Sequence, residues 1–184
     1  LTLLFTRMLA GAADNTICYY SPRAAEKATH AYQLAKAVCF YSPWQFLFWY
    51  DRPPASPGGK GGAGGVRNVI GNEPELEFFE AVPTVWDETR VICGQIGEYA
   101  LIARRSGSEW FIGGMNTEEP RTLELPLAFL EEGRDYLAHV YFDDENSETR
   151  TRVKIERRPV DSGSVLQVRL GRNGGQAMRI VPID

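Results

Sequence analysis

The stretch Tyr136-Leu-Ala-His-Val-Tyr-Phe142 carries an apolar or aromatic side chain at every second position, and Leu166-Gln-Val-Arg-Leu170 alternates in the same way. A period of two is typical of a strand with one buried face. Short runs of Asp, Asn, Ser and Gly separate such segments at intervals of about ten residues, as turns do. From Val82 onward the sequence therefore predicts an antiparallel sandwich or barrel of roughly seven or eight strands.

The residues before Val82 follow a different pattern. Leu1-Thr-Leu-Leu-Phe-Thr-Arg-Met8 is an apolar run without alternation, which suits a strand covered on both faces, as in a parallel sheet. Ser21-Pro22 are favourable residues for a helix start, and apolar side chains then recur at steps of three and four, which predicts a helix over 22–41. Strand, loop and helix form one β/α unit, and we expect a second helical stretch at Trp44–Tyr50.

A glycine- and proline-rich segment, residues 53–66, interrupts the chain. Its composition is that of a flexible loop, and Gly61 stands where a phosphate-binding loop needs Ser or Thr after the lysine. Beyond it, a short helix is expected at Glu73–Glu80, with Asn72 as its cap. We divide the chain into an α/β portion, residues 1–81, and a β-sandwich, residues 82–184.

The composition excludes several classes of protein. Of the 184 residues 43% are hydrophobic and 24% are charged, which is typical of a folded domain and not of a disordered chain. The net charge of −4 and the absence of a basic run argue against a nucleic-acid partner, and no stretch is long enough for a membrane span. The three cysteines have no metal-ligand spacing and are read as small buried hydrophobic residues.

Three groups of side chains could carry chemistry, and each also has a structural interpretation. Asp87 and Glu88 are adjacent, so on a strand they point to opposite faces and a structural role is favoured. The acidic run Asp143–Glu145 lacks the spacing of a calcium loop and is expected to be a solvated turn. The aromatic residues of Trp44–Tyr50 could stack on sugars, although packing in a core or domain interface is favoured.

Asp14 is the acid with the most informative position. It lies in the loop that follows the expected strand, which is the active face if that strand belongs to a (β/α)8 barrel. An aspartate that hydrogen-bonds its own turn explains the position equally well, and both interpretations remain open.

Several segments, taken in order, resemble glycoside hydrolase family 97, a family of α-glucosidases and α-galactosidases. The resemblance spans nearly the whole chain except the glycine-rich segment. The matching segments are Phe5-Thr-Arg-Met-Leu-Ala-Gly11 with Asp14 and Thr16, Tyr41-Ser-Pro43, Val82-Pro-Thr-Val-Trp-Asp-Glu-Thr-Arg-Val91, Gly97-Glu-Tyr99, Ile102-Ala-Arg-Arg105, Glu109-Trp-Phe-Ile-Gly113 and Gly174-Gly-Gln-Ala177. The family loop usually reads Gly-Pro-Met-Asp-Tyr-Thr-Pro, from which residues 11–17 depart at four positions.

The resemblance implies the C-terminal portion of a larger enzyme. The fold would be an α+β fragment, in which the last β/α unit of a (β/α)8 barrel is followed by an antiparallel β-sandwich. The catalytic carboxylates and the calcium-binding glutamates of the family precede Leu1, so no catalytic or metal-binding residue is assigned in this chain. Asp14 and Thr16 would line the barrel mouth and bind an oligosaccharide substrate.

The resemblance also suggests a partner and a compartment. The partner is the N-terminal remainder of the same protein, and a periplasmic or secreted location is expected because family members are often exported. The alternative is a non-catalytic carbohydrate-binding or structural β-sandwich module with a helical segment before it.

Overall fold

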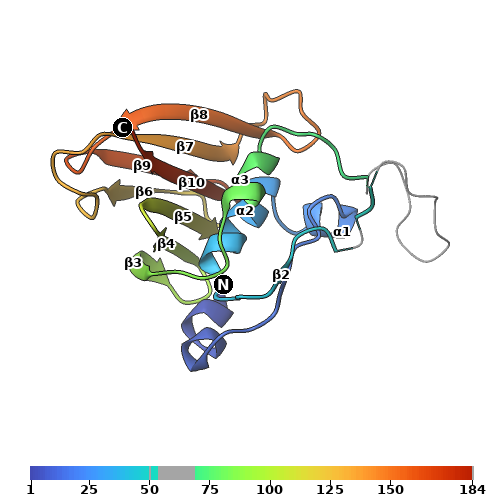
Figure 1. Cartoon of the computed structure of the whole chain (residues 1–184). Coiled ribbons are helices and arrows are strands. Elements are labelled where there is room, and N and C mark those ends of the chain that lie inside the picture. Colours follow the sequence, from blue (N-terminus) through green and yellow to red (C-terminus); the bar gives the residue numbers. More distant parts are fainter. Residues whose placement is uncertain (50, 54–68, 184) are drawn as a thin grey trace.

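The computed structural model describes residues 1–49, 51–53 and 69–183. Apart from Pro53, the loop predicted to be flexible at 53–66 lies outside the described residues. The chain is mostly antiparallel β-sheet with few helices, and it forms a β-sandwich with one helical layer (Figure 1).

The sandwich begins at Glu88 and consists of two sheets. The large sheet has the strand order β3-β4-β5-β10-β7-β8, and the small sheet is the antiparallel pair β6-β9. The prediction of roughly seven or eight strands in this region is confirmed. Their bounds are β3 Glu88–Gln95, β4 Tyr99–Ser106, β5 Glu109–Asn116, β6 Arg121–Pro126, β7 Tyr136–Asp143, β8 Val153–Val160, β9 Val165–Leu170 and β10 Gly175–Pro182.

Alternation along the strands produces the sandwich core. On β9, Leu166, Val168 and Leu170 are buried while the residues between them are exposed. These side chains pack against Leu101, Ile112 and Met178 of the large sheet. Burial of apolar surface on this scale is the main favourable term in folding, so the alternating pattern accounts for the formation of the two layers.

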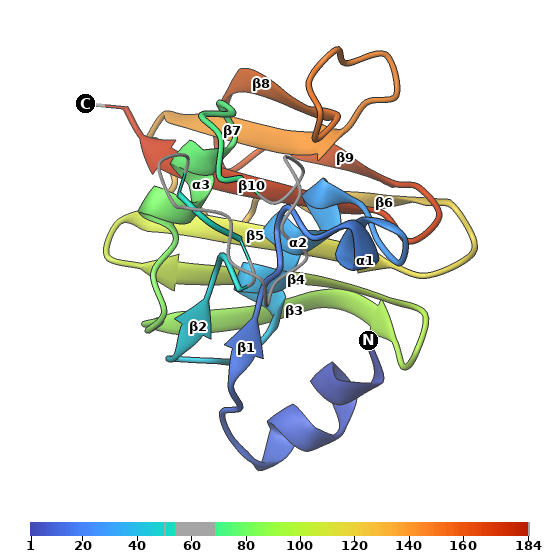
Figure 2. The ribbon, with the colours of Figure 1, turned by 90° about the vertical axis from the view of Figure 1, so that its right-hand side faces the viewer.

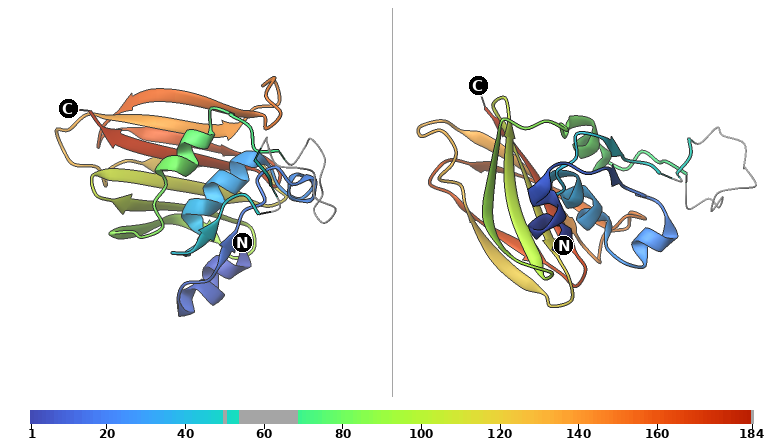
Figure 3. Two further views of the ribbon diagram at one scale, coloured as in Figure 1. Left: turned by 45° about the vertical axis from the view of Figure 1, so that its right-hand side comes forward. Right: turned by 90° about the horizontal axis from the view of Figure 1, so that it is seen from below.

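Helix α2, His30–Cys39, covers the other face of the large sheet, and Figure 3 shows this helical layer beside the sandwich. The close approach depends on two glycines. A Cβ on Gly113 would lie 2.6 Å from the Ala35 carbonyl oxygen, and a Cβ on Gly175 would lie 2.4 Å from Tyr32 Cα. Only glycine therefore permits α2 to seat on β5 and β10 at this distance.

The expected strand at residues 1–8 is wrong. This segment forms two short 3-10 helices, η1 Thr2–Phe5 and η2 Arg7–Ala10. Leu1, Leu4 and Phe5 recur near the three-residue period of such a helix, and they pack against Ala100, Ile102 and Met115. The strand lies later, at β1 Asn15–Thr16, and pairs in parallel with β2 Gln45–Phe46 (Figure 2).

The three predicted helices differ from the structure: one is split in two, one is absent from the described residues and one is shorter. The helix expected at 22–41 is two helices, α1 Pro22–Ala25 and α2, because Thr29 caps the second by accepting a hydrogen bond from Tyr32 N. The helix expected at Trp44–Tyr50 is wrong, since β2 and turns occupy its described part. The helix expected at Glu73–Glu80 is α3, Leu76–Ala81, preceded by a turn at Pro74–Glu75.

Candidate functional site

The first candidate site is one face of the β1–β2 pair. Thr16 is in register with Phe46, and Asn15 is in register with Gln45. Because successive side chains on a strand alternate, Asp14 and Thr16 share a face with Trp44 and Phe46. All four residues are exposed, and the ring centroids of Trp44 and Phe46 lie 5.5 Å apart.

The opposite face of β1–β2 is buried against α2. Asn15 Nδ2 donates to Gln45 Oε1 at 3.0 Å, and Gln45 Nε2 donates to the Ala37 carbonyl oxygen of α2 at 3.0 Å. Ile17, fully buried, packs with Leu34 and Val38 of the same helix. The helix therefore fixes which face of the pair is open.

Asp14 precedes its strand instead of following it, which corrects the position expected from the sequence. The structure does bring Asp14 and Thr16 together, as residues two apart on one extended segment. Neither side chain hydrogen-bonds another described residue. Beside exposed aromatic rings, a carboxylate and a hydroxyl can accept and donate hydrogen bonds to a hydroxyl-rich ligand.

A second cluster joins three glutamates to three tyrosines. Glu73, Glu75 and Glu77 occupy alternate positions, and each accepts a hydrogen bond from a tyrosine hydroxyl: Tyr20, Tyr19 and Tyr141, respectively. Burial, and next the charge of Glu75, raises the pKa of Tyr19 well above its usual value. These hydroxyls therefore stay protonated and serve as donors, which is a structural role and not that of a nucleophile or base.

Asp143 is not part of a solvated turn, as its sequence context predicted. Its carboxylate accepts hydrogen bonds from Thr29 Oγ1 at 2.7 Å, Gly175 N at 3.2 Å and Ala31 N at 3.3 Å. Burial raises the pKa of Asp143, although these three bonds act in the opposite direction. The residue anchors the N-terminus of α2, where a negative charge is favourable.

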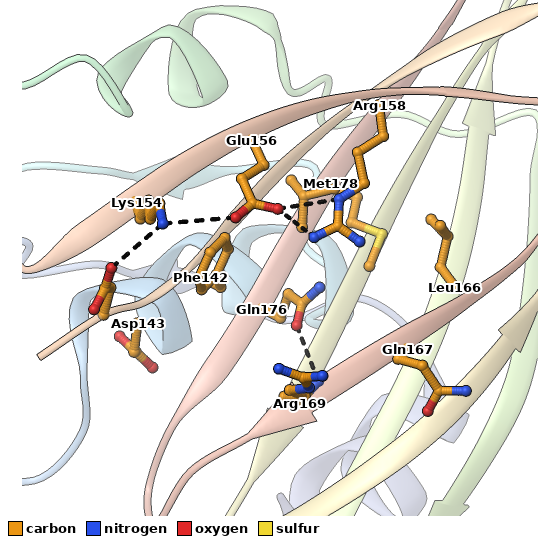
Figure 4. A pocket seen from close by; sticks show the side chains of 12 residues that line it. Phe142, Asp143, Lys154, Glu156, Arg158, Leu166, Gln167, Arg169, Gln176 and Met178 are labelled. Carbon is orange, nitrogen blue, oxygen red and sulfur yellow. Dashed lines mark hydrogen bonds and ion pairs between the residues drawn. The ribbon is translucent and has the colours of Figure 1, made fainter. Parts of the chain in front are cut away.

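The groove in Figure 4 lies between β8 and β9 and encloses about 330 Å³. Most of its charged groups are paired: Lys154 Nζ lies 3.7 Å from both Glu156 and Asp144, and Arg158 binds Glu156. Gln176 Oε1 accepts from the Arg169 backbone N–H at 3.1 Å, at the open edge of β9. No nucleophile with a neighbouring base lines this groove, so it offers no catalytic pair.

Asp87 and Glu88 have the structural role that their spacing favours. Asp87 accepts a hydrogen bond from Gly107 N at 2.7 Å, and Glu88 binds Arg90 and Arg105. Among the described residues, no three His, Cys, Asp or Glu side chains form a group that could hold a metal ion.

Asp143 and the glutamate–tyrosine cluster were missed because their partners are distant in sequence. Thr29 lies 114 residues from Asp143, and Tyr20 lies 53 residues from Glu73. The alternation of Glu73, Glu75 and Glu77 is visible in the sequence. A single sequence gives no signal, however, for which tyrosine hydroxyls donate hydrogen bonds to them.

Comparisons with known proteins agree with the resemblance. Residues 85–181 match the family model described as glycosyl-hydrolase 97 C-terminal, oligomerisation. A retaining alpha-galactosidase from Bacteroides thetaiotaomicron is 32% identical over 164 residues, which cover 89% of this chain and 22% of that protein. A probable retaining alpha-galactosidase from Streptomyces bingchenggensis is 32% identical over 181 residues, covering 96% of this chain and 24% of that protein.

A solved structure supports the same relationship. A glycoside hydrolase family 97 enzyme in complex with acarbose, from Pseudoalteromonas sp. strain K8, has a TM-score of 0.76 at 27% identity and covers 100% of this chain. The chain spans 22% to 28% of the length of these three relatives. No helix among the described residues has the length and apolar character to cross a bilayer. The chain belongs to glycoside hydrolase family 97 and contains its C-terminal region.

Proposed function

We propose that this chain is the C-terminal part of an α-glycosidase that hydrolyses α-linked oligosaccharides, with α-galactosides as the preferred substrates. The names of the two related α-galactosidases support galactose over glucose. The main catalytic carboxylates, together with the calcium ion expected for the family, would come from the remainder of the enzyme, which we expect to be periplasmic or secreted.

The observation that carries this proposal is the parallel pair β1–β2. Parallel strands occur almost only in sheets covered on both faces, yet this pair is covered by α2 on one face alone. The side chain of Trp44 is 65% exposed on the other face. In a (β/α)8 barrel the face opposite the helices is the packed interior, where Trp44 and Phe46 would be buried. Asp14 and Thr16 would then face the same interior.

The test is to express this chain together with the coding sequence immediately upstream of it. We expect calcium-stimulated hydrolysis of aryl α-galactosides, slower hydrolysis of aryl α-glucosides, and a reduced kcat/KM for Thr16→Ala, since Thr16 ends β1 on the side of the active face. Asp14→Ala tests whether the residue before the strand also reaches the substrate. A longer protein that folds but cleaves neither substrate would contradict the proposal. Unchanged kinetics for Asp14→Ala would remove only the assignment of that residue.

The family description supports a second role, in which the sandwich joins subunits of the enzyme. We expect the longer protein to be an oligomer when its mass is measured by light scattering during gel filtration. A monomer across the full concentration range would contradict this role.

One rival function is favoured by a specific observation, the exposed rings of Trp44, Phe46 and Trp49. Such rings could bind sugars in a free-standing carbohydrate-binding module. Titration of the chain alone with oligosaccharides, followed by tryptophan fluorescence, distinguishes the two functions. Saturable binding that Trp44→Ala abolishes would favour the module.

A further inference from the structure

The segment that follows β1 is held at two neighbouring tyrosines. Tyr19 is 1% exposed, its hydroxyl donates to Glu75 Oε1 at 2.9 Å, and its ring lies 5.0 Å from that of His30. Tyr20 lies beside it in the same turn, with the two ring centroids 5.1 Å apart, and is 5% exposed. Its hydroxyl donates to Glu73. Tyr19 is the inner anchor and Tyr20 the outer anchor, and both rings are buried, but the hydroxyl bond of the outer anchor depends on what holds Glu73.

Arg150 holds the outer anchor. It lies in the connection between β7 and β8, and its Nε atom lies 2.5 Å from Glu73 Oε1. Its Nη2 donates to the Val69 carbonyl oxygen at 2.7 Å, and its guanidinium group lies 4.0 Å from the centroid of the Tyr20 ring. One sandwich side chain thus contacts both the tyrosine and the carboxylate to which the tyrosine is bonded.

The contact of Arg150 with Glu73 and Tyr20 lies beside the loop that follows β1. If β1 is a strand of a (β/α)8 barrel, residues 17–21 form the loop at its carboxyl end, and such loops build the active face. We propose that Arg150 is a positioning residue for the glycosidase reaction, through which the sandwich fixes the loop carrying Tyr20 at the active face. This inference rests on the proposed function.

The three contacts of Arg150 restrict the orientation of its guanidinium group more than a single surface ion pair would. A planar guanidinium that stacks on a ring while binding a carboxylate and a carbonyl has one geometry, whereas a lysine could satisfy only some of these contacts. The Glu73 side chain is 13% exposed and that of Arg150 is 37% exposed, so the carboxylate is largely shielded from solvent while the guanidinium is only partly covered.

The chain offers a matched control in Arg157. This residue, on β8, donates from Nη2 to both oxygens of Glu77, at 3.1 and 3.2 Å, and Glu77 in turn binds a tyrosine hydroxyl. The Arg157 contact therefore repeats the chemistry of arginine, glutamate and tyrosine. It differs in that Tyr141 belongs to β7 and not to the loop after β1.

The experiment compares Arg150→Ala, Arg150→Lys and Arg157→Ala in the longer, active protein. For Arg150→Ala we expect KM for an aryl α-galactoside to rise about tenfold while kcat stays within about twofold, because loop contacts to the substrate are weakened. Arg150→Lys should recover part of the lost affinity. Arg157→Ala should leave KM unchanged even if it lowers the melting temperature by a similar amount.

Amide hydrogen exchange provides a readout that is independent of activity. Arg150→Ala should accelerate exchange at residues 17–21, and Arg157→Ala should not. Equal KM changes in the two alanine variants, or a lower melting temperature for Arg150→Ala with unchanged KM and exchange, would overturn the inference. A folded longer protein without glycosidase activity would instead overturn the proposed function, and the role of Arg150 in that reaction with it.

Discussion

Asp143 connects three segments that are remote in sequence: the turn before α2, the first turn of α2 and the start of β10. Its neighbour Asp144 is partly buried, and Glu145 is exposed as an acidic turn predicts. Asp143 is buried more deeply than these neighbours because it is the last residue of β7 and its side chain faces the helical layer. Burial of a carboxylate is tolerated there because three donors converge on it.

Replacing Asp143 with alanine should destabilise the chain by about 2 to 3 kcal/mol, since three donors lose their acceptor. Asp144→Ala is the control: it loses a 3.7 Å contact with Lys154 and one hydrogen bond from Asn146 N, which together should contribute about 1 kcal/mol. Urea unfolding followed by circular dichroism measures both values. Equal effects of the two substitutions would refute the anchoring role of Asp143.

Glu73 should make stability depend on acid pH. Partial burial acts to raise its pKa, but hydrogen bonds from Arg150 and Tyr20 outweigh burial and hold the pKa below its usual value. A lowered folded-state pKa means that the stabilisation is present above the unfolded pKa and is lost as pH falls through the folded value. The melting temperature of wild type should therefore exceed that of Glu73→Gln at about pH 6, and the gap should narrow towards about pH 3. A gap that is constant with pH would contradict this assignment.

Helix α2 is the element that joins the two halves of the chain. It contacts β5 and β10 through the two glycine positions, and its buried side chains share one cluster with residues of α3, β5 and β7. The division near residue 82 stays a prediction, and the packing of α2 on the large sheet is extensive whichever domain the helix is assigned to.

Gly113→Ala should displace α2 and cost about 3 kcal/mol, because the new Cβ would meet a backbone carbonyl oxygen that cannot move independently of the helix. Gly171→Ala is the control, since a Cβ there meets nothing within 4 Å. Thermal unfolding compares the two variants. A Gly113→Ala variant as stable as Gly171→Ala would show that α2 relaxes without loss of packing.

The sequence predicts the elements of the sandwich well, because alternation reports the two faces of each strand directly. It predicts the N-terminal elements poorly. The apolar run at residues 1–8 fits either a buried strand or a short helix, and tertiary packing on Ala100 and Ile102 selects the helix. β1 and β2 have only two residues each, so no period could be read from them.

At the scale of the whole molecule, exposed aromatic rings gather on the open face of β1 and β2. The sandwich core is closed by its own two sheets, whereas the parallel pair exposes Trp44 and Phe46. Of the site residues, Asp14 is indicated by its loop position after the apolar run at residues 1–8, whereas Thr16 is indicated only through the family resemblance. Their roles remain predictions, because their partners would lie in another part of the enzyme.

The chain by itself should not hydrolyse aryl α-galactosides or α-glucosides, with or without calcium. A barrel site requires groups from several strand ends, and loss of both catalytic carboxylates removes the acid and the base together. The assay compares purified residues 1–184, shown to be folded by circular dichroism, with the longer protein at equal molar concentration. Calcium-dependent turnover by the chain alone would require a carboxylate pair among Asp14, Asp51, Asp87 and Glu88.

The close packing of α2 on Gly113 and Gly175 also limits how the β-sandwich can be transferred between genes. A recombination event that moved the sandwich to another gene without residues 30–39 would leave Gly113 and Gly175 facing an empty hollow on the sheet. A foreign helix with a bulkier contact residue would not fit into that hollow. We therefore expect productive crossovers to fall upstream of His30, so that sandwich and helix pass between genes as one heritable block.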